Sequence, residues 1–252
     1  MRILVTNDDG IHARGLGVAE AIARRFTDDV WVVAPSEEQS GAGHSLTLTR
    51  PLRLRKHAER RFSVTGTPTD AVMMALLEVL DGPPNLILSG VNRGANLGED
   101  VTYSGTVSAA MEGALAGIPS VALSQVYARE AAGENVSFAA AEAWGERAIR
   151  PLLERPFAPG MLVNINFPAL PADAVKGIRV VSQGMRDYGR ASMVKHTDPR
   201  GFPYYWLHFG GAVTTRGHDT DLEVIADGHV AVTPLHLDLT YREALASLTA
   251  SY

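Results

Sequence analysis

The 252-residue sequence contains no cysteine. Disulfide bonds, thiolate metal sites and cysteine nucleophiles are therefore excluded, and the composition fits a reducing compartment. No apolar run approaches the ~20 residues that a membrane-spanning helix needs, and the first residues do not form a basic-then-apolar signal segment. These absences predict a cytoplasmic protein that does not use a membrane as a partner.

An excess of positive charge is also missing, since the formal net charge is −5. Polymeric DNA or RNA is therefore not expected as an obligate partner, because proteins that bind it carry a basic surface. The hydrophobic share of 46% and the charged share of 20% are typical of a globular chain and exclude a fibrous or disordered one. The length suits one large domain, so we expect residues 1–252 to form a single α/β unit.

Several common enzyme motifs are absent. No Gly-x-Gly-x-x-Gly follows the first predicted strand, which argues against a nicotinamide-dependent Rossmann enzyme. The P-loop and the Gly-x-Ser-x-Gly nucleophile elbow are absent too. The eight histidines are scattered without a zinc-binding spacing. We expect His44 and His236, which lie near possible active-site loops, to be hydrogen-bonded structural residues.

Short apolar runs alternate with helical patterns along the chain. A strand at Ile3-Leu4-Val5, a helix at residues 16–26 and a strand at residues 30–34 form a βαβ unit with parallel strands. Further strands are predicted at residues 86–88, 118–123, 161–167, 178–181 and 230–235, exposed strands within 46–64, and helices at 71–80, 104–115, 139–153 and after residue 235. The pattern predicts a three-layer, Rossmann-like α/β fold with a mostly parallel sheet.

The character of the sequence changes at about residues 184–217. Tyr, Trp, Gly, Pro and Arg dominate there, with Tyr204-Tyr205-Trp206-Leu207 as a strand and no core period. Exposed aromatics on a long excursion often mark contact surfaces. We therefore predict a protruding arm or an interface element.

Two adjacent carboxylates follow the first predicted strand, in Asn7-Asp8-Asp9-Gly10. Ligands of open α/β sheets lie outside the carboxyl ends of the strands, where this turn is expected. Burying two neighbouring carboxylates is costly unless a cation is present, and hard oxygen donors suit Mg²⁺, Mn²⁺ or Ca²⁺. Alone, the four residues are more often a solvated Asx turn.

Two other loops are expected at the same edge of the sheet. They carry Ser40, in residues 36–43, and the amides Asn92 and Asn96. Each of these residues alone is typical of a turn or a helix cap. Together with Asp8 and Asp9, they are better explained as ligands of one metal ion.

An anion site is predicted beside that ion. Ser104-Gly105-Thr106 opens a helix, where free N–H groups and the helix dipole bind phosphate, although an ordinary N-cap has the same residues. A metal beside a phosphate site indicates phosphoester hydrolysis, with Asp8 or Asp9 accepting a proton from water.

Several blocks of the sequence match one family. They are Asn7-Asp8-Asp9-Gly10, Gln39-Ser40-Gly41-Ala42, Gly66-Thr67-Pro68-Thr69-Asp70, residues 89–98 (SGVNRGANLG), Tyr103-Ser104-Gly105-Thr106-Val107, Asp198-Pro199-Arg200-Gly201 and residues 233–240 (TPLHLDLT). The chain resembles the SurE survival-protein family over nearly its full length, and the block at 89–98 is highly specific.

The resemblance implies a metal-dependent 5'/3'-nucleotidase, an acid-phosphatase-like phosphoric monoester hydrolase that acts on nucleoside monophosphates, and some members also cleave polyphosphate ends. It implies one Mg²⁺ or Mn²⁺ per subunit and a homodimer or homotetramer formed through the arm and the C-terminal segment. By motif, the catalytic residues are Asp8 and Asp9, the metal ligands are Asp8, Asp9, Ser40 and Asn92, and the phosphate or substrate binders are Asn7, Gly41, Asn96, Ser104, Gly105 and Thr106. Arg14, where a proline is expected, and Ala71, where many relatives carry cysteine, depart from the pattern.

Two alternatives remain open at this point. A phospho-acceptor signalling domain also places paired acids after its first strand, but it needs an aspartate at the end of the third strand, where this chain has Leu88-Ser89-Gly90. A catalytically silent nucleotide-binding or scaffold protein would keep the same fold. Phosphate release from AMP with and without EDTA separates these classes.

Overall fold

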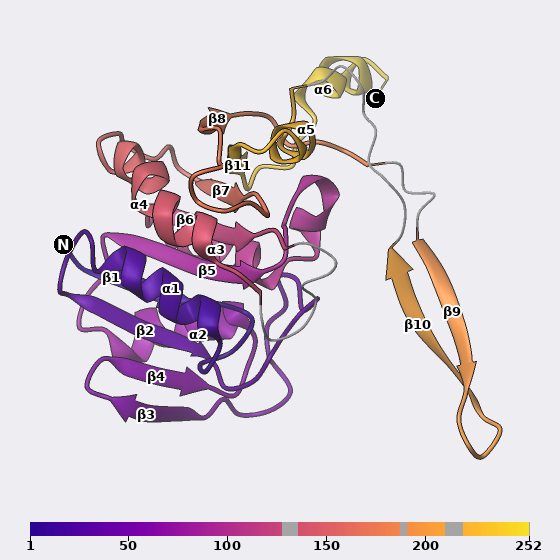
Figure 1. The fold of residues 1–252 in the computed structure, drawn as a ribbon, viewed down its shortest axis with the longest axis horizontal. Helices are drawn as coiled ribbons and strands as arrows, with labels where there is room; N and C mark the ends of the chain where they lie inside the picture. Colours follow the sequence, from indigo (N-terminus) through magenta and orange to yellow (C-terminus); the bar gives the residue numbers. More distant parts are fainter. Residues whose placement is uncertain (128–135, 187–190, 210–218, 252) are drawn as a thin grey trace.

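The computed structural model describes residues 1–127, 136–186, 191–209 and 219–251. Within these ranges one sheet has nine strands, namely β1 (Ile3–Thr6), β2 (Val30–Pro35), β3 (Leu54–Ala58), β4 (Arg61–Val64), β5 (Leu86–Arg93), β6 (Ser120–Gln125), β7 (Met161–Phe167), β8 (Ile178–Val180) and β11 (Val230–His236). Their order is β3-β4-β2-β1-β5-β6-β7-β11-β8. All pairs from β4 to β7 are parallel, while β3 and β11 run antiparallel to β4 and β7 (Figure 1).

Helices cover both faces of the sheet. They are α1 (Arg14–Ala23), α2 (Pro68–Met74), α3 (Gly105–Leu115), α4 (Ala139–Leu153) and α5 (Asp221–Ala226), with a π-helical turn at Ala75–Val79 and a 3-10 turn at Gly98–Thr102. A further helix, α6 (Arg242–Thr249), follows β11. Successive side chains of β1 point to opposite faces. Ile3 and Val5 therefore join a core with α1 and α4, whereas Leu4 joins a core with α2 and α3. This arrangement confirms the predicted three-layer α/β fold.

Some predicted elements differ from the observed ones. The region at 46–64 contains strands only at β3 and β4, and β4 is not exposed, because Phe62 and Val64 pack in the core that contains α2. Strand β5 continues to Arg93, so Asn92 lies in a strand and not in the predicted loop. Helix α5 was not predicted. Helix α4 and strand β7 have the predicted bounds. No helix in the described ranges is both long and apolar enough to cross a membrane.

An antiparallel hairpin projects away from the sheet (Figure 1). It consists of β9 (Ala191–Thr197) and β10 (Pro203–Phe209), and we call it the arm. Tyr205 and Trp206 are more than half exposed, which confirms an excursion with exposed aromatics. Residues 187–190 and 210–217 of the predicted excursion lie outside the described residues. Helix α6 has no buried residue within this single chain.

Candidate active site

A cavity of about 450 Å³ brings together side chains from three predicted loops. Its walls include Asp8, Ser40, Gly41, Asn92, Asn96 and Ser104. The parallel register of β1 with β5 and β2 places the loops that follow them at one edge of the sheet. A backbone hydrogen bond from Gln39 N to Asp8 O, 2.8 Å long, ties the Ser40 loop to the end of β1. The predicted convergence of these loops is confirmed.

Asp8 is the deepest of these side chains and is only 4% exposed. The Thr106 hydroxyl donates a hydrogen bond to Asp8 Oδ1 at 2.5 Å. Burial raises the pKa of Asp8 to about 6, although hydrogen bonds from Thr106 oppose the shift, and the negative charge of Asp9 adds to it. The charge on Asp8 is therefore poorly compensated by its surroundings.

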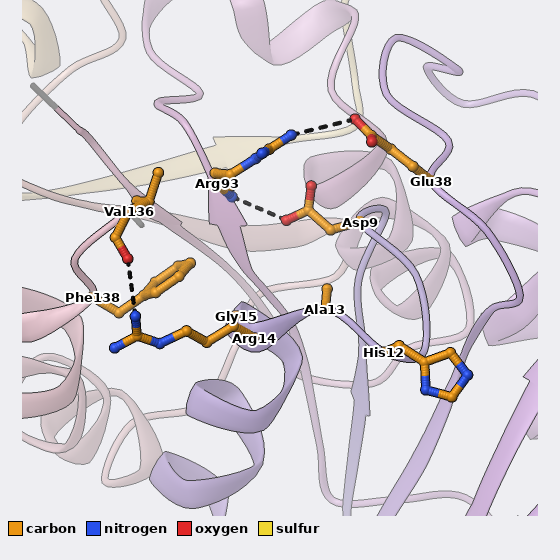
Figure 2. Close-up of a pocket in the computed structure, with 9 residues that line it drawn as sticks. All are labelled: Asp9, His12, Ala13, Arg14, Gly15, Glu38, Arg93, Val136 and Phe138. Atoms are coloured by element: carbon orange, nitrogen blue, oxygen red, sulfur yellow. Dashed lines mark hydrogen bonds and ion pairs between the residues drawn. The ribbon is translucent and has the colours of Figure 1, made fainter. Parts of the chain in front are cut away.

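Asp9 faces a different space. It lines a neighbouring cavity of about 340 Å³ with His12, Arg14, Arg93 and Phe138 (Figure 2). The backbone N–H of Arg93 donates to Asp9 Oδ2 at 3.0 Å. Burial raises the pKa of Asp9, although this hydrogen bond and the positive charge of Arg93 act to lower it. Arg93 lines both cavities, so any ion shared by the two aspartates has to lie where the cavities adjoin.

Ser40 and Asn92 present oxygen atoms whose partners differ. Ser40 Oγ donates to Glu38 Oε1 at 2.8 Å, so its lone pairs are still able to meet a cation. The Asn92 amide nitrogen donates to Gly94 O at 3.1 Å, which leaves the amide oxygen as the atom for a cation. Both are hard oxygen donors of the kind predicted.

The start of α3 meets Asp8 at close range. Ser104 is its N-cap, because Ser104 Oγ accepts from Val107 N at 3.1 Å. A Cβ on Gly105 would lie 2.9 Å from Asp8 Cβ, so only glycine fits there without movement. The Thr106 side chain is fully buried and engaged with Asp8, so its hydroxyl is committed to the carboxylate. The Thr106 backbone N–H also interacts with Asp8, so the backbone N–H of Gly105 is left as an anion donor at this helix start.

Asn96 is held by a buried polar cluster that was not predicted. Its amide nitrogen donates to Ser124 Oγ at 2.8 Å, and its backbone N–H donates to Asn166 Oδ1 at 2.9 Å. Its carbonyl accepts from Asn164 Nδ2 at 2.7 Å. In the sequence, Asn164 and Asn166 alternate with apolar residues of β7, which by itself predicts a solvent-facing side, whereas the structure buries both amides.

Four further residues of the main cavity were not predicted as site residues. They are Arg93, Asp100, Tyr103 and Leu207. The first three lie in or beside the SGVNRGANLG block, but nothing in the sequence shows which of its side chains face the cavity. Leu207 comes from β10 of the arm, and its proximity depends on tertiary structure.

Asn7 and the two histidines lie away from the walls of the main cavity. Asn7 is fully buried, and its amide nitrogen donates to Gly10 O at 3.0 Å, which closes the turn that carries the aspartates. In the described part of the chain, Asn7 Oδ1 has no hydrogen-bond partner. His44 pairs with Glu112, and His236 with Pro159 O, each at 3.1 Å, as expected for hydrogen-bonded structural residues.

The donor set fits a hard divalent cation. Among the described residues, no group of three or more His, Cys, Asp or Glu side chains is placed to hold a metal. A site here therefore has to combine the aspartates with hydroxyl and amide oxygens, which are ligands of Mg²⁺ and Mn²⁺. The raised pKa of the buried Asp8 is the observation that fits, because a cation would remove the cost of its charge.

Comparison with known proteins agrees with this architecture. The family model described as "Survival protein SurE" matches residues 3–190. The chain is 68% identical over 253 residues to a protein of Rhizorhabdus wittichii named 5'-nucleotidase SurE, with both chains covered in full. It is 62% identical to the protein of that name from Erythrobacter litoralis, covering 98% of this chain and 97% of the relative.

A solved structure has the same fold. The crystal structure of the SurE protein from Aquifex aeolicus superposes with a TM-score of 0.84 at 38% sequence identity, covering 100% of this chain and 99% of that one. The motifs that line the cavity at the end of β1 and β5 are thus set in a shared fold. The chain belongs to the SurE survival-protein family.

Proposed function

We propose that this protein is a divalent-cation-dependent nucleotidase that hydrolyses nucleoside monophosphates to nucleoside and phosphate. The observation that carries the proposal is the single cavity onto which Asp8, Ser40, Asn92, Asn96 and Ser104 open. The name 5'-nucleotidase of two relatives that are 68% and 62% identical supports the substrate class.

In this proposal Asp8, Asp9, Ser40 and Asn92 hold one Mg²⁺ or Mn²⁺. The ion, when bound, polarises a phosphoryl oxygen and lowers the pKa of water. Asp8 or Asp9 then accepts the proton of the attacking water. The Thr106 hydroxyl keeps Asp8 oriented for this role.

The phosphate group is bound beside these ligands. The proposed donors are the Asn96 amide, the Gly105 N–H, the Ser104 hydroxyl and the Gly41 backbone. Thr106 supports them through its hydrogen bonds to Asp8, and Asn7 by shaping the aspartate turn. The Tyr103 and Leu207 side chains add an apolar wall to the same cavity, which suits a nucleoside.

Assembly and location belong to the proposal too. We propose a homodimer or homotetramer that buries the arm and α6, supported by the exposed Trp206 and Leu248. Residues 1–252 act as one domain in it. The cytoplasmic location stays a prediction, as does the cleavage of short polyphosphate.

The deciding experiment measures phosphate release from AMP. Purified protein is assayed with Mg²⁺ or Mn²⁺, then with EDTA, and then with the metal restored. Metal-dependent, EDTA-reversible release supports the proposal. Tight AMP binding without release would favour the silent nucleotide-binding alternative, and a stable acyl phosphate on the protein would favour a phospho-acceptor domain.

A further inference from the structure

Residues 183–186, which precede the arm in the sequence and which we call its root, are hydrogen-bonded to the chain segment between Asn96 and Ser104. Arg186 Nη1 donates to Leu97 O at 3.0 Å and to Glu99 Oε1 at 3.3 Å, and lies 2.7 Å from Asp100 Oδ2. The backbone N–H of Arg186 donates to Glu99 Oε2 at 2.9 Å. The Arg186 side chain is only 14% exposed and that of Glu99 20%, so the contacts between these two residues are largely shielded from water, whereas Asp100 is 44% exposed.

A second set of bonds ties the same two segments together. Asp221 Oδ2 accepts from Gly98 N at 2.9 Å and Asp221 Oδ1 from Gly184 N at 2.8 Å. Gln183 Nε2 donates to Gly98 O at 2.8 Å. A Cβ on Gly98 would lie 3.2 Å from Gly184 O, so the two backbones are in close contact. The cavity wall therefore depends on residues from the root of the arm for its position.

Charge adds a reason for placing an arginine there. Asp100 lines the cavity in which the phosphate is proposed to bind, and Glu99 precedes it in the chain. Burial acts to raise the pKa of Glu99, but the backbone N–H and guanidinium of Arg186 outweigh it and lower that pKa. Two carboxylates beside a phosphate site repel the substrate unless a cation balances them.

We propose that Arg186 is a positioning residue of the active site, which holds the wall between Asn96 and Ser104 and neutralises Glu99 and Asp100 so that a phosphate dianion binds. The arm root is then part of the substrate site. The inference deepens the proposed nucleotidase function and rests on it for its kinetic readout.

The test compares Arg186→Ala with Arg186→Lys and with the control Arg179→Ala. Arg179, on β8, forms an exposed ion pair with Asp219 and lines neither cavity, so Arg179→Ala is a matched removal of an arginine side chain. We expect Arg186→Ala to raise the KM for AMP about tenfold or more, with a smaller change in kcat, because Glu99 and Asp100 then lack the positive charge of Arg186 and oppose anion binding more strongly. Arg186→Lys keeps the charge and should recover part of the affinity.

A double variant separates the charge role from simple loss of packing. Adding Asp100→Asn to Arg186→Ala should return KM most of the way to the wild-type value, because Asp100 is the one of the two carboxylates that lines the cavity and its charge is then removed. A KM for Arg186→Ala that matches Arg179→Ala overturns the proposal. So does a double variant that is no better than the single one, since that is the behaviour of a purely structural arginine.

Failure of the proposed function gives a different result. Wild-type protein that releases no phosphate from AMP refutes the nucleotidase, and the inference is then tested by calorimetric titration with inorganic phosphate. Arg186→Ala should weaken that binding about tenfold, with recovery in the double variant. Equal phosphate affinities in all variants, or no binding by the wild type, would overturn the role of Arg186.

Discussion

Gly105→Ala tests whether the contact between the start of α3 and Asp8 sets the activity. The added Cβ would lie 2.9 Å from Asp8 Cβ, 3.1 Å from Asp8 Oδ2 and 3.1 Å from Pro68 Cγ. Carbon atoms in contact are normally about 3.5–4.0 Å apart, so the shortfall from Asp8 Cβ is roughly 0.6–1.1 Å. Asp8 is buried and bonded to Thr106, so relief requires a shift of the carboxylate or of the helix start.

The expected cost falls mainly on catalysis. Gly105 lies in a helix without a positive φ, so alanine alone would favour the helix by about 0.5–1 kcal/mol. The overlap is expected to cancel that gain and to leave the protein destabilised by about 1–3 kcal/mol. A displacement of about 1 Å at a reacting group costs on the order of 100-fold in rate, so we expect kcat/KM to fall about 10–100-fold.

Gly17→Ala is the matched control. Gly17 lies inside α1, and a Cβ there meets no atom within 4 Å. It should gain about 0.5–1 kcal/mol of stability and keep its activity. The assay is AMP hydrolysis with Mn²⁺ alongside thermal unfolding. If the kcat/KM of Gly105→Ala for AMP were within about twofold of that of Gly17→Ala, the reasoning about Asp8 would be refuted.

Three further predictions concern the metal ligands and a buried acid. Asp9→Asn should nearly abolish AMP turnover while far-UV circular dichroism stays native, because asparagine still accepts from Arg93 N but carries no charge; full activity would exclude Asp9 as a metal ligand. Mn²⁺ at about 100 times its Kd should raise the unfolding free energy by about 2.7 kcal/mol, seen as a higher Tm that Asp9→Asn lacks; an equal shift in both proteins would place the ion elsewhere. Asp221→Asn loses one acceptor for Gly98 N or Gly184 N and should cost about 1–3 kcal/mol in denaturant unfolding. Burial raises the pKa of Asp221 above its ordinary 3.8, so the Asp221 carboxylate binds a proton more tightly in the native state than in the unfolded state. The contribution of Asp221 to stability is therefore full below pH 3.8 and is lost as the pH rises through its pKa in the native state. If the unfolding free energy of Asp221→Asn changed with pH in the same way as that of the wild type, this sign would be contradicted.

Local patterns were sufficient where an element repeats a single period. Helix α4 and strand β7 have the bounds that apolar spacing and alternation predict. Local patterns gave a wrong prediction where pairing with another element changed the burial of a strand. Strand β4 was expected to be exposed, but pairing with β2 and packing in the core that contains α2 bury it.

The candidate site divides in the same way. Its oxygen donors were predicted because parallel strands bring the turns that follow them to one edge, and six of the predicted residues line one cavity. The separation of Asp8 from Asp9 was not predicted, since neighbouring residues give no sign of which cavity each one faces. The amides Asn164 and Asn166 were also missed, because alternation in a strand does not distinguish a solvent face from a buried polar one.

The sequence by itself determined the strand–turn–helix units, the family and the donor residues at the strand ends, because turn chemistry and helical period act over a few residues. Tertiary structure alone decided the antiparallel β11, the bonding of Asn96 to β6 and β7, and the link from Arg186 to the cavity wall. Such contacts join residues 28 to 89 positions apart, and their free energy depends on burial and charge that only the folded chain creates.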